Sequence, residues 1–267
     1  MKQDHEMGFL DHLEELRWRL IRILIAVVVG VAVSFAVSRY VLDLLTLPAA
    51  RMEPPLDFQS LKIQGMFVVI LEIGIFGGII LALPYALYQL WGFVSPALME
   101  HERRYIYPIL GFSTLLFATG LLFAYWVILP LAMEFFVGLA PPEIAANIAI
   151  DLYIGFVIRI LVLFGVIFQL PILSYFLAKV GLLTSTFMRT YRRHGIVTIF
   201  VIAALLTPPD PMTQIFMGIP LILLYELSVY IVRVVERGNE RRERKYQAEL
   251  EREERERNAA EGSSADQ

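Results

Sequence analysis

The chain has 267 residues, of which 57% are hydrophobic and 18% are charged, and its mean hydropathy is +0.63. Soluble domains average about 45–50% apolar and 25% charged residues, so this composition excludes an ordinary soluble protein and indicates a polytopic membrane protein. Because the chain has no cysteine, a disulfide framework, thiolate chemistry and a cysteine zinc site are excluded. The net charge of −3 is uninformative, since acids and bases are segregated along the sequence.

The N-terminal segment, residues 1–20, is charged and amphipathic, so we expect it to lie on the membrane surface and not to be a cleaved signal. Its stretch HLEELRWRL stands directly before the first apolar run. On a helix, Glu14 would meet Arg17 at i+3 and Glu15 would meet Arg19 at i+4. Such exposed pairs contribute only about 0.3–0.5 kcal/mol, so another arginine could displace them at little cost.

The apolar runs predict an all-α integral membrane protein with six transmembrane helices, because a bilayer core of about 30 Å needs about 20 apolar helical residues. The predicted spans are residues 21–42, 65–93, 105–137, 152–178, 195–206 and 215–232, within a transmembrane domain of residues 21–232. Pro84, Pro108 and Pro130 predict tilt or kinks in the second and third spans. The fifth span is short: residues 195–207 give roughly 20 Å of helix. The fifth and sixth helices should therefore form a shallow hairpin.

The distribution of Lys and Arg predicts that both termini are cytoplasmic. One side holds four basic residues before and at the start of the first span, and also the basic residues of the second and fourth loops and of the C-terminal tail. The other side holds only Arg39, Arg51 and Lys62. The tail, residues 233–267, mixes both signs of charge with hardly an apolar residue, so we expect a solvated helix that fades into disorder.

The motifs of enzymes are missing from the sequence. GFSTL at Gly111 lacks the second glycine of a serine-protease motif, and HEMGF and HERRY fail to match the zinc motif His-Glu-x-x-His. We therefore expect no enzyme, no metal and no cofactor. Among the polar residues within the predicted spans, the candidates for a function inside the membrane are Glu72, Arg159, Gln169 and Glu226. On the residues alone, a secondary transporter of a small solute that uses Glu72, Arg159 and Gln169 is the alternative to a role in protein transport.

Depth along the spans places two of these charges at one level. Glu72 lies eight residues after Gln64, and Arg159 lies eight after Asp151, so both are roughly 12 Å inside the membrane from the non-cytoplasmic side. A charge at such a depth is costly unless it has a partner. We expect an interhelical ion pair between Glu72 and Arg159. The alternative is that each side chain reaches separately for the outer interface.

Four motifs together resemble one known family. HLEELRWRL, LYQLWGFVSPALMEHERR, FGVIFQLP and LLTPPD are similar, in this order, to the TatC family, the polytopic subunit of the twin-arginine protein translocase. The resemblance extends from His12 to Arg233. It implies a receptor for the twin-arginine signal peptides of folded proteins, in an oligomeric complex with single-span TatA and TatB subunits. It also implies a bacterial inner-membrane location and transport driven by the proton-motive force, with no nucleotide, cofactor or nucleic acid.

The resemblance also implies a signal-peptide site. Glu15 and Glu102 match the carboxylates of the family that bind the signal arginines, and a carboxylate can hold a planar guanidinium through two parallel hydrogen bonds. Glu102 has no basic residue at helical spacing, so we expect it to be available. Arg17 matches a family arginine and is expected to orient Glu15 or to contact lipid phosphate. Phe93 matches a family aromatic residue beside the site, with simple packing as the alternative.

The remaining candidates have structural alternatives. Gln169 stands where relatives commonly carry glutamate, so we expect a polar group that holds water and not a proton relay. Glu226 is expected to contact a partner or to form an intramolecular bond. Pro48 should shape the non-cytoplasmic cap, and Pro208 and Asp210 should shape the turn before the last span.

Overall fold

The structure is a computed structural model, and it describes residues 9–52, 55–94, 106–139, 147–206 and 211–265. Its elements in chain order are α1 (Phe9–Ala36), α2 (Ser38–Ala50), β1 (Asp57–Gln59), α3 (Gly65–Val94), α5 (Ile106–Phe123), the π-helix η2 (Ala124–Ile128), α6 (Leu129–Gly138), β2 (Asn147–Ala149), α7 (Ile150–Ile167), α8 (Leu170–Lys179), α9 (Ser185–Thr190), α10 (Arg192–Leu206) and α11 (Pro211–Ala265).

The helical architecture confirms the predicted fold class. Among the described residues, five helical stretches are long and apolar enough to cross a membrane: Leu13–Ala36, Gly65–Phe93, Tyr107–Gly138, Ile150–Lys179 and Gln214–Arg252. The expected fifth span corresponds to α10, whose 15 residues give roughly 22 Å of helix. A sixth crossing and the cytoplasmic position of the termini stay predictions. The prediction overlooked β1 and β2, which are three residues each and lie in loops between spans.

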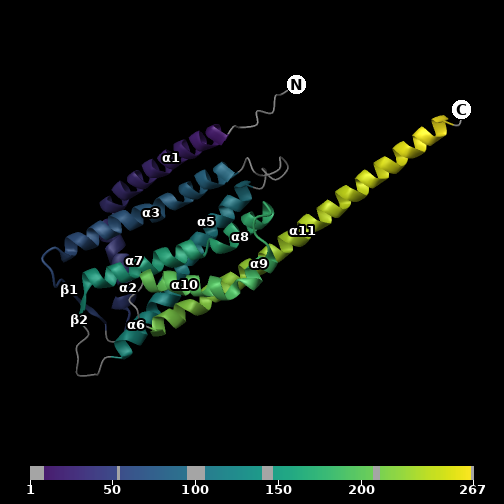
Figure 1. Ribbon diagram of the computed structural model, residues 1–267. Coiled ribbons are helices and arrows are strands. Elements are labelled where there is room, and N and C mark those ends of the chain that lie inside the picture. Colours follow the sequence, from purple (N-terminus) through teal and green to yellow (C-terminus); the bar gives the residue numbers. More distant parts are fainter. Residues whose placement is uncertain (1–8, 53–54, 95–105, 140–146, 207–210, 266–267) are drawn as a thin grey trace. The chain divides into compact units, whose positions relative to one another are not determined.

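The chain divides into two compact units, and the first comprises residues 1–169 and 197–222. Its centre is α7, which packs against α2, α3, α5 and η2 (Figure 1). Ile154, Ile160 and Phe164 of α7 are fully buried. Burial on several sides is typical of a helix that has protein rather than lipid as its neighbours. The first unit is therefore a bundle built around α7.

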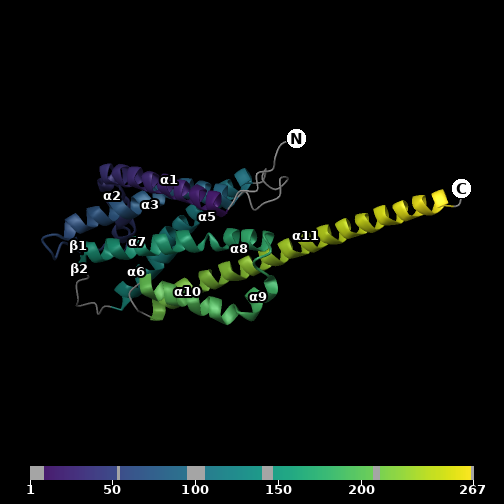
Figure 2. The same ribbon diagram turned by 45° about the horizontal axis from the view of Figure 1, so that its top comes forward.

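Helices α1 and α3 lie side by side, and small residues let their backbones approach closely (Figures 1 and 2). A Cβ atom added to Gly30 would lie 2.5 Å from the carbonyl oxygen of Gly78. The Ser34 hydroxyl donates a hydrogen bond of 2.9 Å to the carbonyl oxygen of Ile73. Small residues and interhelical hydrogen bonds are the main forces that join helices in a bilayer. This contact fixes α1 on α3.

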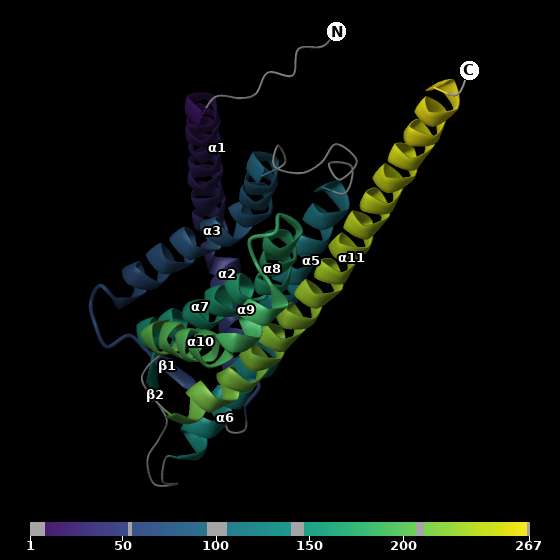
Figure 3. The ribbon, with the colours of Figure 1, turned by 45° about the vertical axis from the view of Figure 1, so that its right-hand side comes forward.

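Proline positions explain two irregularities. The N–H of Leu129 donates to the carbonyl oxygen of Ala124, five residues back, and Pro130 follows with no N–H of its own. A π-helical turn is a common way to absorb such an interruption. Helix α3 contains Pro84 and changes direction along its length (Figure 3). The kinks expected in the second and third spans are thus present near two of the three prolines.

The loops opposite the N-terminal end of α1 form a cap around α2. Pro48 lies inside α2 and has no N–H, so the carbonyl oxygen of Leu44, four residues earlier, lacks its helical donor. The Tyr125 hydroxyl supplies that hydrogen bond at 2.7 Å. Strands β1 and β2 pair in parallel, with Phe58 opposite Ile148. The role of Pro48 in shaping the non-cytoplasmic cap stays a prediction.

The second unit comprises residues 170–196 and 223–267. Ala178, Met188, Val229 and Val232 form its core. Gly181, with a φ of 80°, makes the left-handed turn between α8 and α9. The Tyr225 hydroxyl donates to the carbonyl oxygen of Met188 at 2.8 Å. In the tail, α11 stays helical to Ala265, with exposed i,i+4 ion pairs such as Glu251–Arg255 at 3.8 Å (Figure 3).

The contact between α1 and α3 can be tested with two glycines. Gly30→Ala should destabilise the protein by about 1–3 kcal/mol, because the new methyl group overlaps the Gly78 carbonyl. Gly111→Ala on α5 is the control: its Cβ would meet nothing within 4 Å, so stability should be unchanged or raised by up to about 1 kcal/mol. Thermal unfolding in detergent measures both. Equal effects would show that α1 and α3 are not closely packed.

Candidate functional site

The N-terminal part of α1 is joined to the end of α3 by one arginine. Arg19 donates to Oε1 of Glu15 from Nε at 2.9 Å and from Nη2 at 2.6 Å. Its Nη1 donates to the carbonyl oxygen of Gln89 at 3.1 Å. The side chains of Arg19 and Glu15 are only 20% and 25% exposed, so this ion pair is stronger than a fully solvated one. The Glu15 carboxylate is therefore held by a guanidinium at the edge of the membrane.

Two residues of α3 make room for Arg19. Gln89 is buried, and its amide nitrogen donates to the Tyr85 hydroxyl at 2.7 Å, which fixes the amide in place. Gly92 lies against the Arg19 guanidinium, and a Cβ atom at this position would overlap Nη1. A glycine is therefore required here by space and not by backbone conformation. Gln89 and Gly92 together therefore determine where the Arg19 guanidinium lies on α3.

The other charges at this end of α1 differ in their contacts. The i,i+4 pair of Glu15 and Arg19 is confirmed. The expected i,i+3 pair of Glu14 and Arg17 is not formed. Among the described residues these two side chains make no ion pair within 4 Å, and both are exposed to solvent. Hydration of two exposed charges offsets the small gain of such a pair. The expected role of Arg17, to orient Glu15 or to contact lipid phosphate, stays a prediction.

Two more predicted site residues lie near the end of α3. Phe93 follows Gly92 directly and is half-buried. Glu102 belongs to residues 95–105, which are outside the described residues. The structure therefore brings Glu15, Arg19 and the Phe93 end of α3 together, while the position of Glu102 stays a prediction.

Gln169 is bound to α5 through two hydrogen bonds. The Ser113 hydroxyl donates to Oε1 of Gln169 at 2.6 Å, and Nε2 of Gln169 donates to the carbonyl oxygen of Ser113 at 3.2 Å. Ser113 is fully buried. In a bilayer such bonds contribute roughly 0.6 kcal/mol on average, and they satisfy groups that hydrocarbon cannot. Gln169 thus links its segment to α5, while its expected role in holding water stays a prediction.

Glu72 and Arg159 flank one glycine of α7. A Cβ atom added to Gly155 would lie 3.4 Å from Oε2 of Glu72 and 3.8 Å from Nη2 of Arg159. The expected direct ion pair is nevertheless not formed, since among the described residues these two groups are not within 4 Å of each other. Oε2 of Glu72 is buried without a hydrogen-bond partner, whereas Arg159 is exposed. The two charges therefore lie beside the same glycine without a direct contact within 4 Å.

Glu226, in the second unit, forms an ion pair with Arg192, with Oε1 and Nε 2.7 Å apart. This contact favours the intramolecular role over contact with a partner. Pro208 and Asp210 lie outside the described residues. Among the residues that the structure describes, no group of three or more His, Asp or Glu side chains is arranged to hold a metal ion.

Comparison with known proteins gives a consistent result over most of the chain. The profile of the family "Sec-independent protein translocase protein (TatC)" matches residues 11–220. The TatC protein of Aquifex aeolicus is 39% identical over 233 residues, which cover 86% of this chain and 97% of the relative. The TatC protein of Desulforapulum autotrophicum is 36% identical over 87% of both chains. The chain belongs to the TatC family.

A solved structure agrees with this assignment. The crystal structure of a twin-arginine translocase receptor TatC has 40% sequence identity and a TM-score of 0.78, over 84% of this chain and 99% of that one. The predicted family and the role in the twin-arginine protein translocase are thereby confirmed. A small-solute transporter, the alternative raised by the intramembrane polar residues, is set aside.

Several residues that build this TatC site were missed in the sequence. Gln89 and Gly92 stand inside the motif LYQLWG, but their spacing from Arg19 along the chain gives no sign of contact. Ser113 was missed for the same reason, because it lies 56 positions before its partner Gln169 in the sequence. A polar residue inside an apolar span is the one available signal, since it needs a partner. Such a signal indicates that a partner exists but not which residue it is.

The two charges beside Gly155 can be tested for coupling. Glu72→Gln and Arg159→Gln should each lower the thermal stability in detergent, and the double variant should cost less than their sum, by about 0.5 kcal/mol or more. Lys62 and Asp151 form an ion pair at 3.3 Å, so a second double-mutant cycle with Lys62→Gln and Asp151→Asn provides the comparison. If the stability losses of the Glu72 and Arg159 variants are additive while the comparison cycle shows coupling, these two charges act independently.

Proposed function

We propose that this TatC-family chain is the receptor subunit of the translocase and binds twin-arginine signal peptides through Glu15 and Glu102. The observation that carries the proposal is the guanidinium of Arg19 on the Glu15 carboxylate. A carboxylate that already accepts two N–H donors from an arginine is suited to accept those of an incoming arginine. Lysine presents a point charge and cannot reproduce this planar geometry, so the requirement for arginine follows.

Exchange of one arginine for another limits the cost of binding. Arg19 keeps its hydrogen bond to the carbonyl oxygen of Gln89 when a signal arginine takes over Glu15, so the displaced guanidinium does not lose all its partners. A charged hydrogen bond contributes about 1.5–3 kcal/mol, and partial exposure favours the low end. Two such contacts give about 3–6 kcal/mol, which corresponds to a Kd between millimolar and tens of micromolar. The apolar segment of the signal must supply the rest.

A surface for that apolar segment begins beside Glu15. Leu16, Leu20, Leu24 and Val28 recur every four residues on α1, and all are exposed in the isolated chain. Residues four apart lie on one helix face, so they form a continuous apolar stripe that leads from the charged end into the membrane. An apolar helix of a signal peptide would lie along this stripe in place of lipid.

The remaining parts of the proposal come from the charge distribution and the family. We infer that both termini are cytoplasmic, in the inner membrane of a bacterium, because basic residues gather on the side that bears them. The proposed partners are single-span subunits of the TatA and TatB type, in an oligomeric complex. The chain itself performs no catalysis and holds no cofactor in this scheme. Glu102 then lies on the same side of the membrane as Glu15.

Neutralising Glu102 tests the second carboxylate. Glu102→Gln should weaken binding of a labelled twin-arginine signal peptide to the purified protein by about tenfold or more, because the amide loses the charge and one acceptor face. Glu102→Ala should be at least as severe. Glu100→Gln, two positions earlier with the same charge change, is the control and should bind normally. Wild-type affinity of the Glu102 variants would contradict the assignment.

Charge reversal tests the first carboxylate. Glu15→Arg should abolish binding of a twin-arginine peptide through like-charge repulsion, and a peptide with an acidic replacement should regain part of the affinity. Glu14→Arg is the matched control, since Glu14 is exposed, adjacent and unpaired with Arg17 in the described structure. Fluorescence anisotropy with both peptides measures the effect. Equal losses in the two variants would assign the effect to overall charge.

A further inference from the structure

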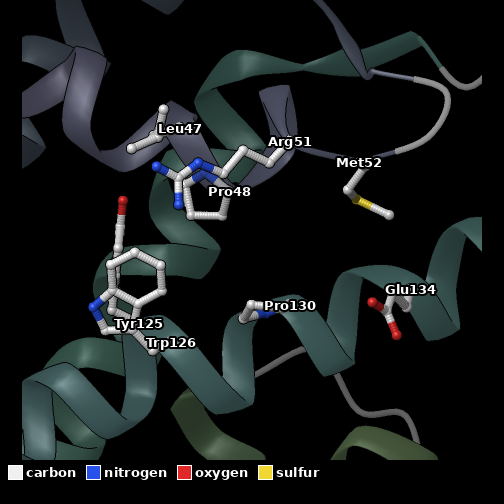
Figure 4. Close-up of a pocket in the computed structure, with 8 residues that line it drawn as sticks. All are labelled: Leu47, Pro48, Arg51, Met52, Tyr125, Trp126, Pro130 and Glu134. Atoms are coloured by element: carbon white, nitrogen blue, oxygen red, sulfur yellow. The ribbon is translucent and has the colours of Figure 1, made fainter.

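A pocket of about 410 Å³ lies between the end of α2 and the segment η2–α6. Figure 4 shows its lining: Arg51 follows α2, and Trp126, Pro130 and Glu134 come from η2 and α6. The last three are spaced by four residues, so they lie along one side of the helical rod. All belong to the first unit. None is part of the proposed signal-peptide site.

The level of the pocket in the membrane follows from helix length. Trp126 lies 21 residues after Tyr105, where the predicted third span begins, which is roughly 30 Å along the rod and about the thickness of the hydrocarbon core. Its side chain is 56% exposed, as is typical of a tryptophan at a membrane–water interface. Glu134 lies two turns further out. The pocket therefore spans the head-group layer on the side opposite the N-terminal end of α1.

Two opposite charges border the pocket without neutralising each other. The Arg51 guanidinium lies over the Trp126 ring, 5.5 Å from its centre. Glu134 is exposed on α6. In the part of the chain that the structure describes, neither Arg51 nor Glu134 forms an ion pair within 4 Å. Each charge can therefore accept a group of opposite sign from a ligand.

The surface beside the pocket indicates a lipid ligand. Leu122 and Leu115, four and eleven residues before Trp126, lie on the same side of the rod toward the membrane centre, and both are exposed. They offer acyl chains a surface directly below the charged groups. A soluble anion would use Arg51 but would leave this apolar surface and Glu134 unused. A ligand that uses all three has a phosphate, an ammonium group further out, and hydrocarbon beneath.

We propose that this pocket binds the head group of a phospholipid with a primary amine, of the phosphatidylethanolamine class, in the non-cytoplasmic leaflet. The Arg51 guanidinium binds the phosphodiester, for which its planar set of donors is suited. The Glu134 carboxylate accepts hydrogen bonds from the ammonium group. The Trp126 ring packs on the glycerol region. Phosphatidylglycerol lacks the ammonium group, and phosphatidylcholine lacks its N–H donors, so both should bind more weakly.

The test is lipid binding to the purified, delipidated full chain in detergent, measured by native mass spectrometry and by thermal shift. Phosphatidylethanolamine should bind and stabilise more than phosphatidylglycerol or phosphatidylcholine of equal chain length. Arg51→Gln should weaken binding of phosphatidylethanolamine about tenfold. Glu134→Gln should lower the affinity for phosphatidylethanolamine to that for phosphatidylglycerol, and it should leave phosphatidylglycerol binding unchanged. If Arg51→Gln is unstable, Arg51→Lys replaces it and should give an intermediate loss, since it keeps the charge without the planar donors.

Controls of equal charge are available on α2. Arg39→Gln and Asp43→Asn remove exposed charges outside the pocket lining, and both should retain wild-type lipid binding. Equal losses in the control and pocket variants would overturn the proposal, as would equal binding of phosphatidylglycerol and phosphatidylethanolamine to the wild type. Full competition by free phosphoethanolamine or inorganic phosphate would identify a soluble ligand and overturn the lipid assignment. Signal-peptide affinity, measured in parallel, should not change in any variant, so failure here is distinct from failure of the proposed receptor function.

Discussion

Hydrocarbon offers no hydrogen-bond partner, and this constraint governs the polar groups of the chain. Ser34 finds its acceptor on α3, and Gln169 and Ser113 satisfy each other between helices. The Tyr125 hydroxyl fills the gap that Pro48 leaves in α2. In each case the hydrogen bond links two segments that are distant along the chain. The polar groups that the membrane would penalise thus determine which helices lie together.

The close contact of α1 and α3 gives the proposed receptor site its geometry. Small residues bring the two backbones together in the membrane, and this contact carries Arg19 to the carbonyl of Gln89 at its edge. Without that approach, Arg19 would be an ordinary i,i+4 partner of Glu15 on a solvated helix. With it, the Glu15 carboxylate is held in one orientation against α3. A preorganised acceptor of this kind loses less entropy when a ligand arginine arrives.

The fold class could be predicted from the sequence because hydrophobicity over 20 residues is a local property. The Glu15–Arg19 pair could be predicted for the same reason, since i,i+4 spacing fixes the neighbourhood. Contacts between helices could not be predicted from the sequence, because they depend on the rotation of each helix about its axis. Equal depth suggested that Glu72 and Arg159 would pair, but depth does not determine the direction in which a side chain points. The strands β1 and β2 could not be predicted from the sequence for a related reason: each is three residues long and pairs only with the other.

Two arginines of the first unit lie where charged groups meet the membrane surface, and their surroundings differ. Arg19 is held by a carboxylate and a backbone carbonyl, so its donors are used within the protein. Arg51 contacts the face of an indole ring, which attracts the cation but accepts no strong hydrogen bond along its donor edge. Among the described residues Arg51 forms no ion pair within 4 Å, so its donors are available to a ligand. An arginine whose donors are satisfied positions other groups, whereas one that rests on an aromatic ring retains its capacity to bind a phosphate. By this criterion Arg19 organises the proposed receptor site, and Arg51 belongs to the proposed lipid site.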